Sequence, residues 1–212
     1  LVELHQPKKV VPATVEFVDI AGLVRGASKG EGKGNAFLSN IRDADAVAHV
    51  VRCFEDETIV HVDNRVDPLA DIETIETELI LKDLETVQKR LDKAERAAKG
   101  QDAFEKKALA LSKRLEEALD SGKPATAVSA NDEDEAKILQ DLFLLTNKPS
   151  FFVVNVKDDQ LAEVDSDPLV QKVLSLGAER GVPVVVISAA IESEIMQLPE
   201  EERGEFIESL GL

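Results

Sequence analysis

Two runs of apolar residues in the middle of the chain, spaced alternately four and three positions apart, constrain the fold more than any other feature. This 3.5-residue period continues on both sides of a break at Lys99-Gly100, and it predicts two antiparallel helices with a coiled-coil seam. We expect the first helix to begin near Asp71, after Pro68, and the second to end at Ser121-Gly122. The first helix would project roughly 40 Å at ~1.5 Å per residue, which makes the pair an arm. The predicted seam consists of Ile80, Leu84, Val87, Leu91, Ala94 and Ala98 in the first run and Phe104, Ala108, Leu111, Leu115 and Ala118 in the second.

Apolar segments on either side of the arm have the character of strands. They cover residues 14–20, 46–54, 151–156 and 182–188, and helices are expected over 35–42 and 168–181. Strands that alternate with helices predict an α/β fold with a mostly parallel sheet covered by helices. The expected organisation is therefore a first part of an α/β domain at 1–70, a helical insertion at 71–130, and the second part of that domain at 131–212.

Composition excludes several classes of function. The chain has 25 Lys and Arg against 42 Asp and Glu, a formal net charge of −17, so bulk attraction to nucleic acid or to an anionic membrane is not expected. No apolar run approaches the ~20 residues that span a bilayer, and the single cysteine, Cys53, has no internal disulfide partner. We expect a cytoplasmic protein without a membrane partner.

The arm departs from this acidic background. Residues 82–114 contain ten basic and six acidic residues, a net of +4, so the rest of the chain sums to −21. One interpretation is an ordinary solvated helix surface with i,i+4 ion pairs such as Asp92–Arg96. The other is a docking arm for an RNA-rich partner, since segregated positive charge is what docking to phosphates requires. The candidate partner-binding residues are Lys89, Arg90, Lys93, Arg96, Lys106 and Lys107.

A D-x-x-G pattern follows the first predicted strand, with Asp19 at its start and Gly22 at its end. In phosphoryl-transfer sites, an acid at this position holds Mg²⁺ through water while the glycine amide meets the terminal phosphate. The alternative is a turn begun by the aspartate. The glycine-rich stretch that follows is not a P-loop, because Ala27 and Gly34 stand where G-x-x-x-x-G-K-[ST] requires Gly and Ser or Thr.

Two further polar segments follow predicted strands. Asn155-Val156-Lys157-Asp158 has the N-x-x-D spacing of a base-reading loop, with a polar turn as the alternative, and Ser188-Ala189-Ala190 could place backbone amides beside the same base. Together with Asp19, these residues fall at the carboxyl ends of strands, which is where open α/β sheets bind ligands.

The run from Val15 to Glu73, together with the arm, the NVKDD segment and SAAIE, closely resembles the YchF-type, Obg-like ATPase family of P-loop NTPases. The resemblance covers nearly all of the chain. It implies a G-domain-like fold with an inserted coiled-coil arm, a C-terminal TGS domain, hydrolysis of ATP, in many members preferred over GTP, and association with the ribosome, for which we expect the large subunit.

The resemblance also assigns roles to residues. Asp19, Ala21, Gly22 and Leu23 fall on the family's phosphate and switch segment, and Leu23 stands where many GTPases place the glutamine that orients water. His61 is the resulting catalytic candidate, with a surface histidine of no catalytic role as the alternative. Asn155, Val156 and Asp158, with Ser188, Ala189 and Ala190, fall on the base loops. The family usually has N-x-x-E here, so the shorter Asp158 leaves GTP open beside ATP, with Mg²⁺ as the metal.

These observations leave three hypotheses. The first is a Mg²⁺-dependent switch that hydrolyses ATP or GTP and associates with ribosomes; the second is a ribosome- or RNA-docking module with a vestigial nucleotide site; the third is an α/β domain with a structural hairpin. By the resemblance, the P-loop strand and first switch are expected before Leu1 and the TGS domain after Leu212. We therefore expect the chain as given to be inactive by itself, and its sequence sets no oligomeric state.

Overall fold

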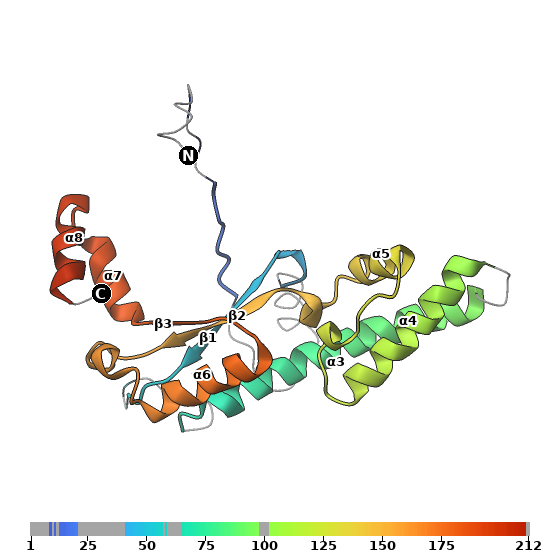
Figure 1. The fold of residues 1–212 in the computed structure, drawn as a ribbon, viewed down its shortest axis with the longest axis horizontal. Coiled ribbons are helices and arrows are strands. Elements are labelled where there is room, and N and C mark those ends of the chain that lie inside the picture. Colours follow the sequence, from blue (N-terminus) through green and yellow to red (C-terminus); the bar gives the residue numbers. More distant parts are fainter. Residues whose placement is uncertain are drawn as a thin grey trace.

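The computed structural model describes residues 9, 11, 13–20, 41–56, 58, 65–97 and 102–210. It consists of a sheet with helices on one face, an arm that leaves one end of the sheet, and a helical pair at the other end (Figure 1). In chain order the elements are β1 (Val47–Arg52), α3 (Pro68–Ala97), α4 (Ala103–Asp120), α5 (Glu133–Asp141), β2 (Ser150–Asn155), α6 (Pro168–Arg180), β3 (Val184–Ile187), α7 (Ala189–Gln197) and α8 (Glu200–Ser209), with 3₁₀ turns η2 (Ala125–Ala127), η3 (Leu145–Asn147) and η4 (Asp159–Glu163).

The sheet is parallel, in the order β1-β2-β3. Val47 pairs with Ser150 and Phe152 pairs with Val184, so the carboxyl ends of the strands lie at one edge. Val51, Val154 and Val156 are buried with Ile72 of α3 and Val170 of α6 in one apolar core. These contacts confirm the predicted α/β class, with a parallel sheet covered by helices.

Local signals set the ends of α6. Asp167 caps the first turn by accepting from the N–H groups of Leu169 and Val170, and Pro168 opens the helix, where its missing N–H costs nothing. Gly181 ends it with φ of 66°, in the left-handed region that glycine adopts without strain. The helix predicted over 168–181 is confirmed.

The predicted helical pair is also confirmed. Along the arm, Val87 and Ala94 of α3 and Ala108, Leu111 and Leu115 of α4 have no exposed surface. The two ends of the second run differ from the prediction: Phe104 is 39% exposed, and Leu119 rather than Ala118 is fully buried. A straight helix with 3.6 residues per turn drifts from a strict 3.5-residue repeat, which moves the buried stripe by one position at the ends.

One buried carboxylate joins the arm to the sheet. Asp83 of α3 is 1% exposed and accepts from the N–H of Leu145 (2.7 Å) and from the N–H and hydroxyl of Thr146 (2.8 and 2.7 Å) in η3, just before β2. Burial raises the pKa of Asp83, while these hydrogen bonds act in the opposite direction. Asp83 thereby fixes the base of the arm against the segment that leads into the sheet.

The strand predicted at 14–20 is wrong. Residues 13–20 form no regular structure, and Val15, Phe17 and Val18 are 78, 79 and 60% exposed. The segment runs away from the sheet in Figure 1. The alternating pattern alone is insufficient, because a strand must pair its N–H and C=O groups with a neighbour, and no described strand pairs with this one. Of the helix predicted at 35–42, residues 41 and 42 are helical and 35–40 lie outside the described residues.

Within the part of the chain that the structure describes, none of the helices combines the length and the apolar character that a membrane span requires.

Candidate functional site

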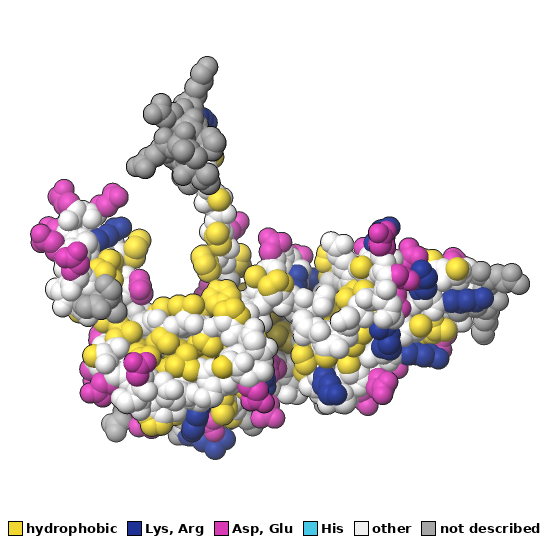
Figure 2. Space-filling view, in the orientation of Figure 1, with side chains coloured by type: hydrophobic (Ala, Val, Ile, Leu, Met, Phe, Trp, Pro, Cys, Tyr) yellow, Lys and Arg dark blue, Asp and Glu magenta, His cyan; other side chains and the backbone are white. Residues whose placement is uncertain are grey.

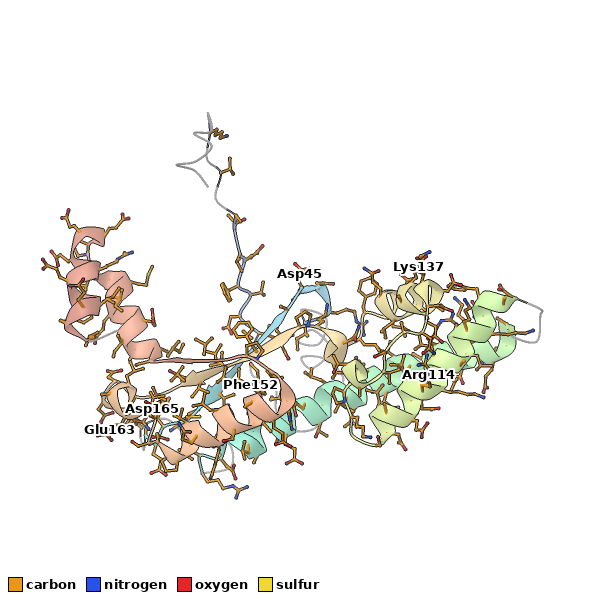
Figure 3. All side chains as sticks on the ribbon, in the orientation of Figure 1. Asp45, Arg114, Lys137, Phe152, Glu163 and Asp165 are labelled. Atoms are coloured by element: carbon orange, nitrogen blue, oxygen red, sulfur yellow. The ribbon has the colours of Figure 1, made fainter. Side chains whose placement is uncertain are left out.

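The carboxyl edge of the sheet brings together polar residues from two segments distant in sequence. Asn155, at the end of β2, accepts through Oδ1 from the Ala189 N–H (3.0 Å). Ser188, which follows β3, donates its hydroxyl to Asp158 Oδ1 (2.5 Å). Figure 3 shows this edge opposite Asp45 at the amino end of β1, with Glu163 and Asp165 in the loop that leads to α6. The N-x-x-D and S-A-A segments therefore form one bonded unit.

Ser188 connects this bonded unit to the first turn of α7. It is 2% exposed and is the N-cap of α7, where its Oγ accepts from the Ile191 N–H (3.4 Å) while donating to Asp158. A serine is favoured at this position because its oxygen satisfies an amide that the helix leaves unpaired. Asp158 is exposed, so a ligand can reach its carboxylate.

The other predicted base-site residues have different surroundings. Val156 is 2% exposed, its side chain lies in the core below the sheet, and its N–H donates to the Ile187 carbonyl (2.9 Å). It supports the loop from beneath. Ala189 and Ala190 are exposed in the first turn of α7, and the Ala189 N–H is already engaged by Asn155.

Gln160 is the residue at this edge that sequence reasoning missed. Its Oε1 accepts from the Lys157 N–H (2.8 Å), and its Nε2 donates to the Cys53 carbonyl (3.3 Å) and to Asp167 Oδ2 (2.7 Å). It thus joins the predicted base loop to the end of β1 and to the cap of α6. The hydrogen bond to the Cys53 carbonyl joins residues 107 positions apart in the sequence, so no local sequence pattern predicts it.

Two further residues near this edge are already engaged in the fold: Lys157 is held by an ion pair, and Cys53 is buried. Lys157 forms an ion pair with Asp56 (Nζ–Oδ2 3.6 Å) in the turn after β1. The Asp56 carboxylate also accepts from the hydroxyl and N–H of Thr58, and these bonds lower its pKa. Burial raises the pKa of the Cys53 thiol to about 12, so it is protonated at neutral pH and is no nucleophile.

Of the residues predicted to contact the phosphates or the metal, Asp19 is the one that the structure describes. Asp19 is exposed at the end of the described segment 13–20, and no group of three or more potential metal ligands occurs among the described residues. A single carboxylate is compatible with Mg²⁺, which keeps several waters and takes its other ligands from substrate phosphates. Ala21, Gly22, Leu23 and His61 lie outside the described residues.

The six predicted arm cations separate into two groups. Arg90 is paired with Glu105 of α4 (3.0 Å), and Lys107 with Asp132 and Asp134 (both 2.7 Å) at the start of α5. By contrast, Lys89, Lys93, Arg96 and Lys106 are exposed and make no ion pair with any described residue. The i,i+4 pair expected between Asp92 and Arg96 does not form.

Helix α5 accounts for much of this pairing. Arg114 of α4 donates to Glu135 Oε2 (2.5 Å) and to the Ser129 carbonyl (3.0 Å), and it lies between the two helices in Figure 3. Burial raises the pKa of Glu135, but hydrogen bonds from the Asn131 N–H and Arg114 outweigh it, and the net shift is downward. The acids of α5 therefore neutralise cations that the count over 82–114 treated as free.

A parallel sheet covered by helices, with an inserted helical arm and polar residues gathered at its carboxyl edge, is an α/β fold of the P-loop NTPase type. A family model described as "50S ribosome-binding GTPase" matches residues 4–95. The chain is 47% identical to the ribosome-binding ATPase YchF of Bacillus subtilis and 43% identical to that of Haemophilus influenzae, in each case over 212 residues. These alignments cover 100% of this chain and 58% and 57% of the two relatives.

A solved structure of the Schizosaccharomyces pombe YchF GTPase matches 99% of this chain and 57% of that protein, with a TM-score of 0.81 and 33% identity. The chain belongs to the YchF-type, Obg-like family. It spans about 58% of the length of the curated relatives that it matches.

Proposed function

We propose that this chain is the nucleotide-binding body of a Mg²⁺-dependent NTPase, with ATP favoured and GTP as the alternative base, that associates with ribosomes. The observation that carries the proposal is the bonded unit of Asn155, Asp158, Ser188 and Ala189 at the carboxyl edge of the sheet. Relatives named as ribosome-binding ATPases support the partner and the reaction.

In this proposal, each residue of the bonded unit and of the loop around it has a defined task. Asn155 braces the loop after β3, and Ser188 orients the Asp158 carboxylate so that its outer oxygen can accept from the edge of a bound base. Gln160 and the Lys157–Asp56 pair hold the loop in that position before a nucleotide arrives. Preorganised groups bind more tightly because less ordering is required on binding.

The remaining tasks are assigned by position in the sequence. Asp19 would hold a water-coordinated Mg²⁺ beside the phosphates, with Ala21, Gly22 and Leu23 in the segment that follows. His61, in the stretch after β1, is our candidate for orienting the attacking water, because Leu23 cannot. When bound, the metal supplies charge neutralisation at the phosphates.

The test is a calorimetric titration of the longer protein that carries this chain with ATP, GTP and ITP in the presence of Mg²⁺. Asp158→Asn and Asn155→Ala should weaken or redirect base binding by about 10- to 100-fold, because a hydrogen bond to a charged group contributes roughly 1.5–3 kcal/mol. The matched control is Asp159→Asn, which removes the neighbouring exposed carboxylate. Unchanged affinities for all three nucleotides in both variants would remove this loop from the site.

The second candidate is a ribosome- or RNA-docking module with a vestigial nucleotide site. It is favoured by Lys89, Lys93, Arg96 and Lys106, which are exposed and form no ion pair with any described residue. Failure of the wild-type longer protein to bind any nucleotide, with ribosome cosedimentation intact, would select it over the enzyme.

A further inference from the structure

Gln160 joins three segments that meet near the carboxyl edge of the sheet. Its partners are the Lys157 N–H (2.8 Å), the Cys53 carbonyl (3.3 Å) and Asp167 Oδ2 (2.7 Å). Lys157 lies in the predicted base loop at 155–158, Cys53 directly follows β1, and Asp167 is the N-cap of α6. One half-buried side chain therefore ties the loop to a strand and to a helix.

These partners fix the direction of the Gln160 amide. The Lys157 N–H needs an acceptor, whereas the Cys53 carbonyl and the Asp167 carboxylate both need a donor. An amide turned by 180° would set Nε2 against the N–H and Oε1 against the two acceptors, so all three hydrogen bonds would be lost. An ionised carboxylate in place of the amide would keep the first bond and lose the other two, because it has no donor.

The loop is restrained from two sides. The S-A-A segment holds it against β3 and α7. On the side of β1, the restraint besides Gln160 is the ion pair of Lys157 with Asp56, whose atoms are 3.6 Å apart and whose side chains are 44 and 25% exposed. Ion pairs at such exposure contribute little. The hydrogen bonds of Gln160 are therefore the stronger restraint on that side.

We infer that Gln160 is a positioning residue for the base loop: the direction of its amide sets where Asn155 and Asp158 meet a bound base. The inference rests on the nucleotide binding proposed above and concerns the same site. A loop that is already in its binding position requires less ordering when the ligand arrives. Loss of this restraint should therefore weaken binding, although Gln160 is not one of the residues that we propose to contact the base.

The experiment exchanges the polarity of the Gln160–Asp167 contact in the longer protein that carries this chain. Gln160→Glu keeps the side-chain length but sets a carboxylate against Asp167 and the Cys53 carbonyl. Asp167→Asn sets a donor against Gln160 Nε2, and asparagine can still cap α6 as well as aspartate does. The double variant Gln160→Glu, Asp167→Asn again places a donor opposite an acceptor, and its net charge equals that of the wild type.

The added negative charge of Gln160→Glu needs a control, because nucleotides are anionic and this end of the molecule is acidic. Figure 2 shows Asp and Glu side chains gathered over α8, and residues 157–167 include five acids and one lysine. The matched control is Gln171→Glu on α6. Gln171 is also half-buried, and its Nε2 donates to the Val164 carbonyl (3.2 Å), outside the base loop.

Calorimetry with ATP and Mg²⁺ should show a Kd raised by about tenfold in Gln160→Glu and by less than about twofold in Gln171→Glu. The double variant should bind within about threefold of the wild type, because a donor again faces an acceptor. The return is incomplete, since the Cys53 carbonyl still lacks its donor. In turnover assays the loss should fall on KM more than on kcat, because the loop is proposed to contact the base and not the phosphates.

Circular dichroism checks that each variant is folded. Asp167→Asn alone should weaken ATP binding in the same direction as Gln160→Glu, and it carries the test if Gln160→Glu is unstable. An unchanged Kd in both single variants, an equal loss in Gln171→Glu, or a double variant as weak as the weaker single variant would each overturn the inference. A fall in kcat at unchanged KM would overturn it as well.

Asp158→Asn separates this failure from that of the proposed function. If Asp158→Asn weakens nucleotide binding and neither Gln160→Glu nor Asp167→Asn does so, the site stands and the positioning role of Gln160 is wrong. If none of these variants changes any affinity, the loop is not part of the site, and the proposed function and this inference fail together.

Discussion

At the scale of single residues, Asp83 fixes the junction between the arm and the segment that leads into the sheet, a role that its sequence position does not indicate. Its carboxylate satisfies two N–H groups and one hydroxyl of η3, all within 2.8 Å, at a point where α3 passes from the sheet into the arm. A buried donor that loses its acceptor costs roughly 1–3 kcal/mol.

We therefore expect Asp83→Ala to lower the free energy of unfolding by about 3 kcal/mol or more. Asp83→Asn should cost less, because one acceptor oxygen remains. The measurement is urea denaturation of this chain, with Asp92→Ala as the control: Asp92 is exposed on the same helix and should change stability by less than about 0.5 kcal/mol. Equal stability of the two alanine variants would contradict the role of Asp83.

At the scale of elements, the sheet side of the molecule depends on how closely α6 approaches β3. Gly177 of α6 makes this approach possible: a Cβ there would lie 2.3 Å from Val184 Cγ2 and 2.9 Å from the Val182 carbonyl oxygen. The Val184 side chain could rotate away from such a Cβ. The Val182 carbonyl could not, because it is part of the backbone turn that Gly181 closes.

Gly177→Ala should therefore destabilise the chain by about 1–3 kcal/mol, despite the better helix propensity of alanine. Gly204→Ala, on α8, is the matched control, because a Cβ there meets no atom within 4 Å. The control should be neutral or stabilise by up to about 1 kcal/mol. Thermal unfolding of both variants decides the matter, and a stabilised Gly177→Ala would show that α6 can move off the sheet without loss.

At the scale of the whole molecule, the groups that we propose to read the base occur in a sequence without a P-loop. The sequence has no G-x-x-x-x-G-K-[ST], so it offers no P-loop lysine and no P-loop hydroxyl for a nucleotide's phosphates and metal. Such charge-assisted bonds contribute roughly 1.5–3 kcal/mol each.

We expect residues 1–212 alone to bind ATP more weakly than the micromolar range, and the longer protein to bind it tightly. Calorimetry of both proteins under the same Mg²⁺ concentration tests this. Micromolar binding by residues 1–212 would mean that the base edge and Asp19 suffice, and the task assigned to a cradle would be wrong.

The sequence by itself determined β1, β2, β3, α3, α4 and α6 and their order, whereas α5, α7 and α8 were not predicted. The 3.5-residue repeat predicted α3 and α4, and the segment 168–181 between two apolar strands predicted α6. The polar residues after β2 and β3 predicted a shared edge, because parallel strands end on the same side. These signals are local or follow from strand direction. The same local evidence gave a wrong strand at 14–20, since alternation cannot report whether a neighbouring strand is there to pair.

Only the tertiary structure decided which side chains are used and which are free. Lys107 and Arg114 look as available as Lys93 in the sequence, yet acids at the start of α5 pair with both of them. Gln160 likewise gains its role from a carbonyl 107 positions away. The physical reason is that ion pairs and hydrogen bonds act over a few ångströms of space, whereas periodicity reports only neighbours along the chain.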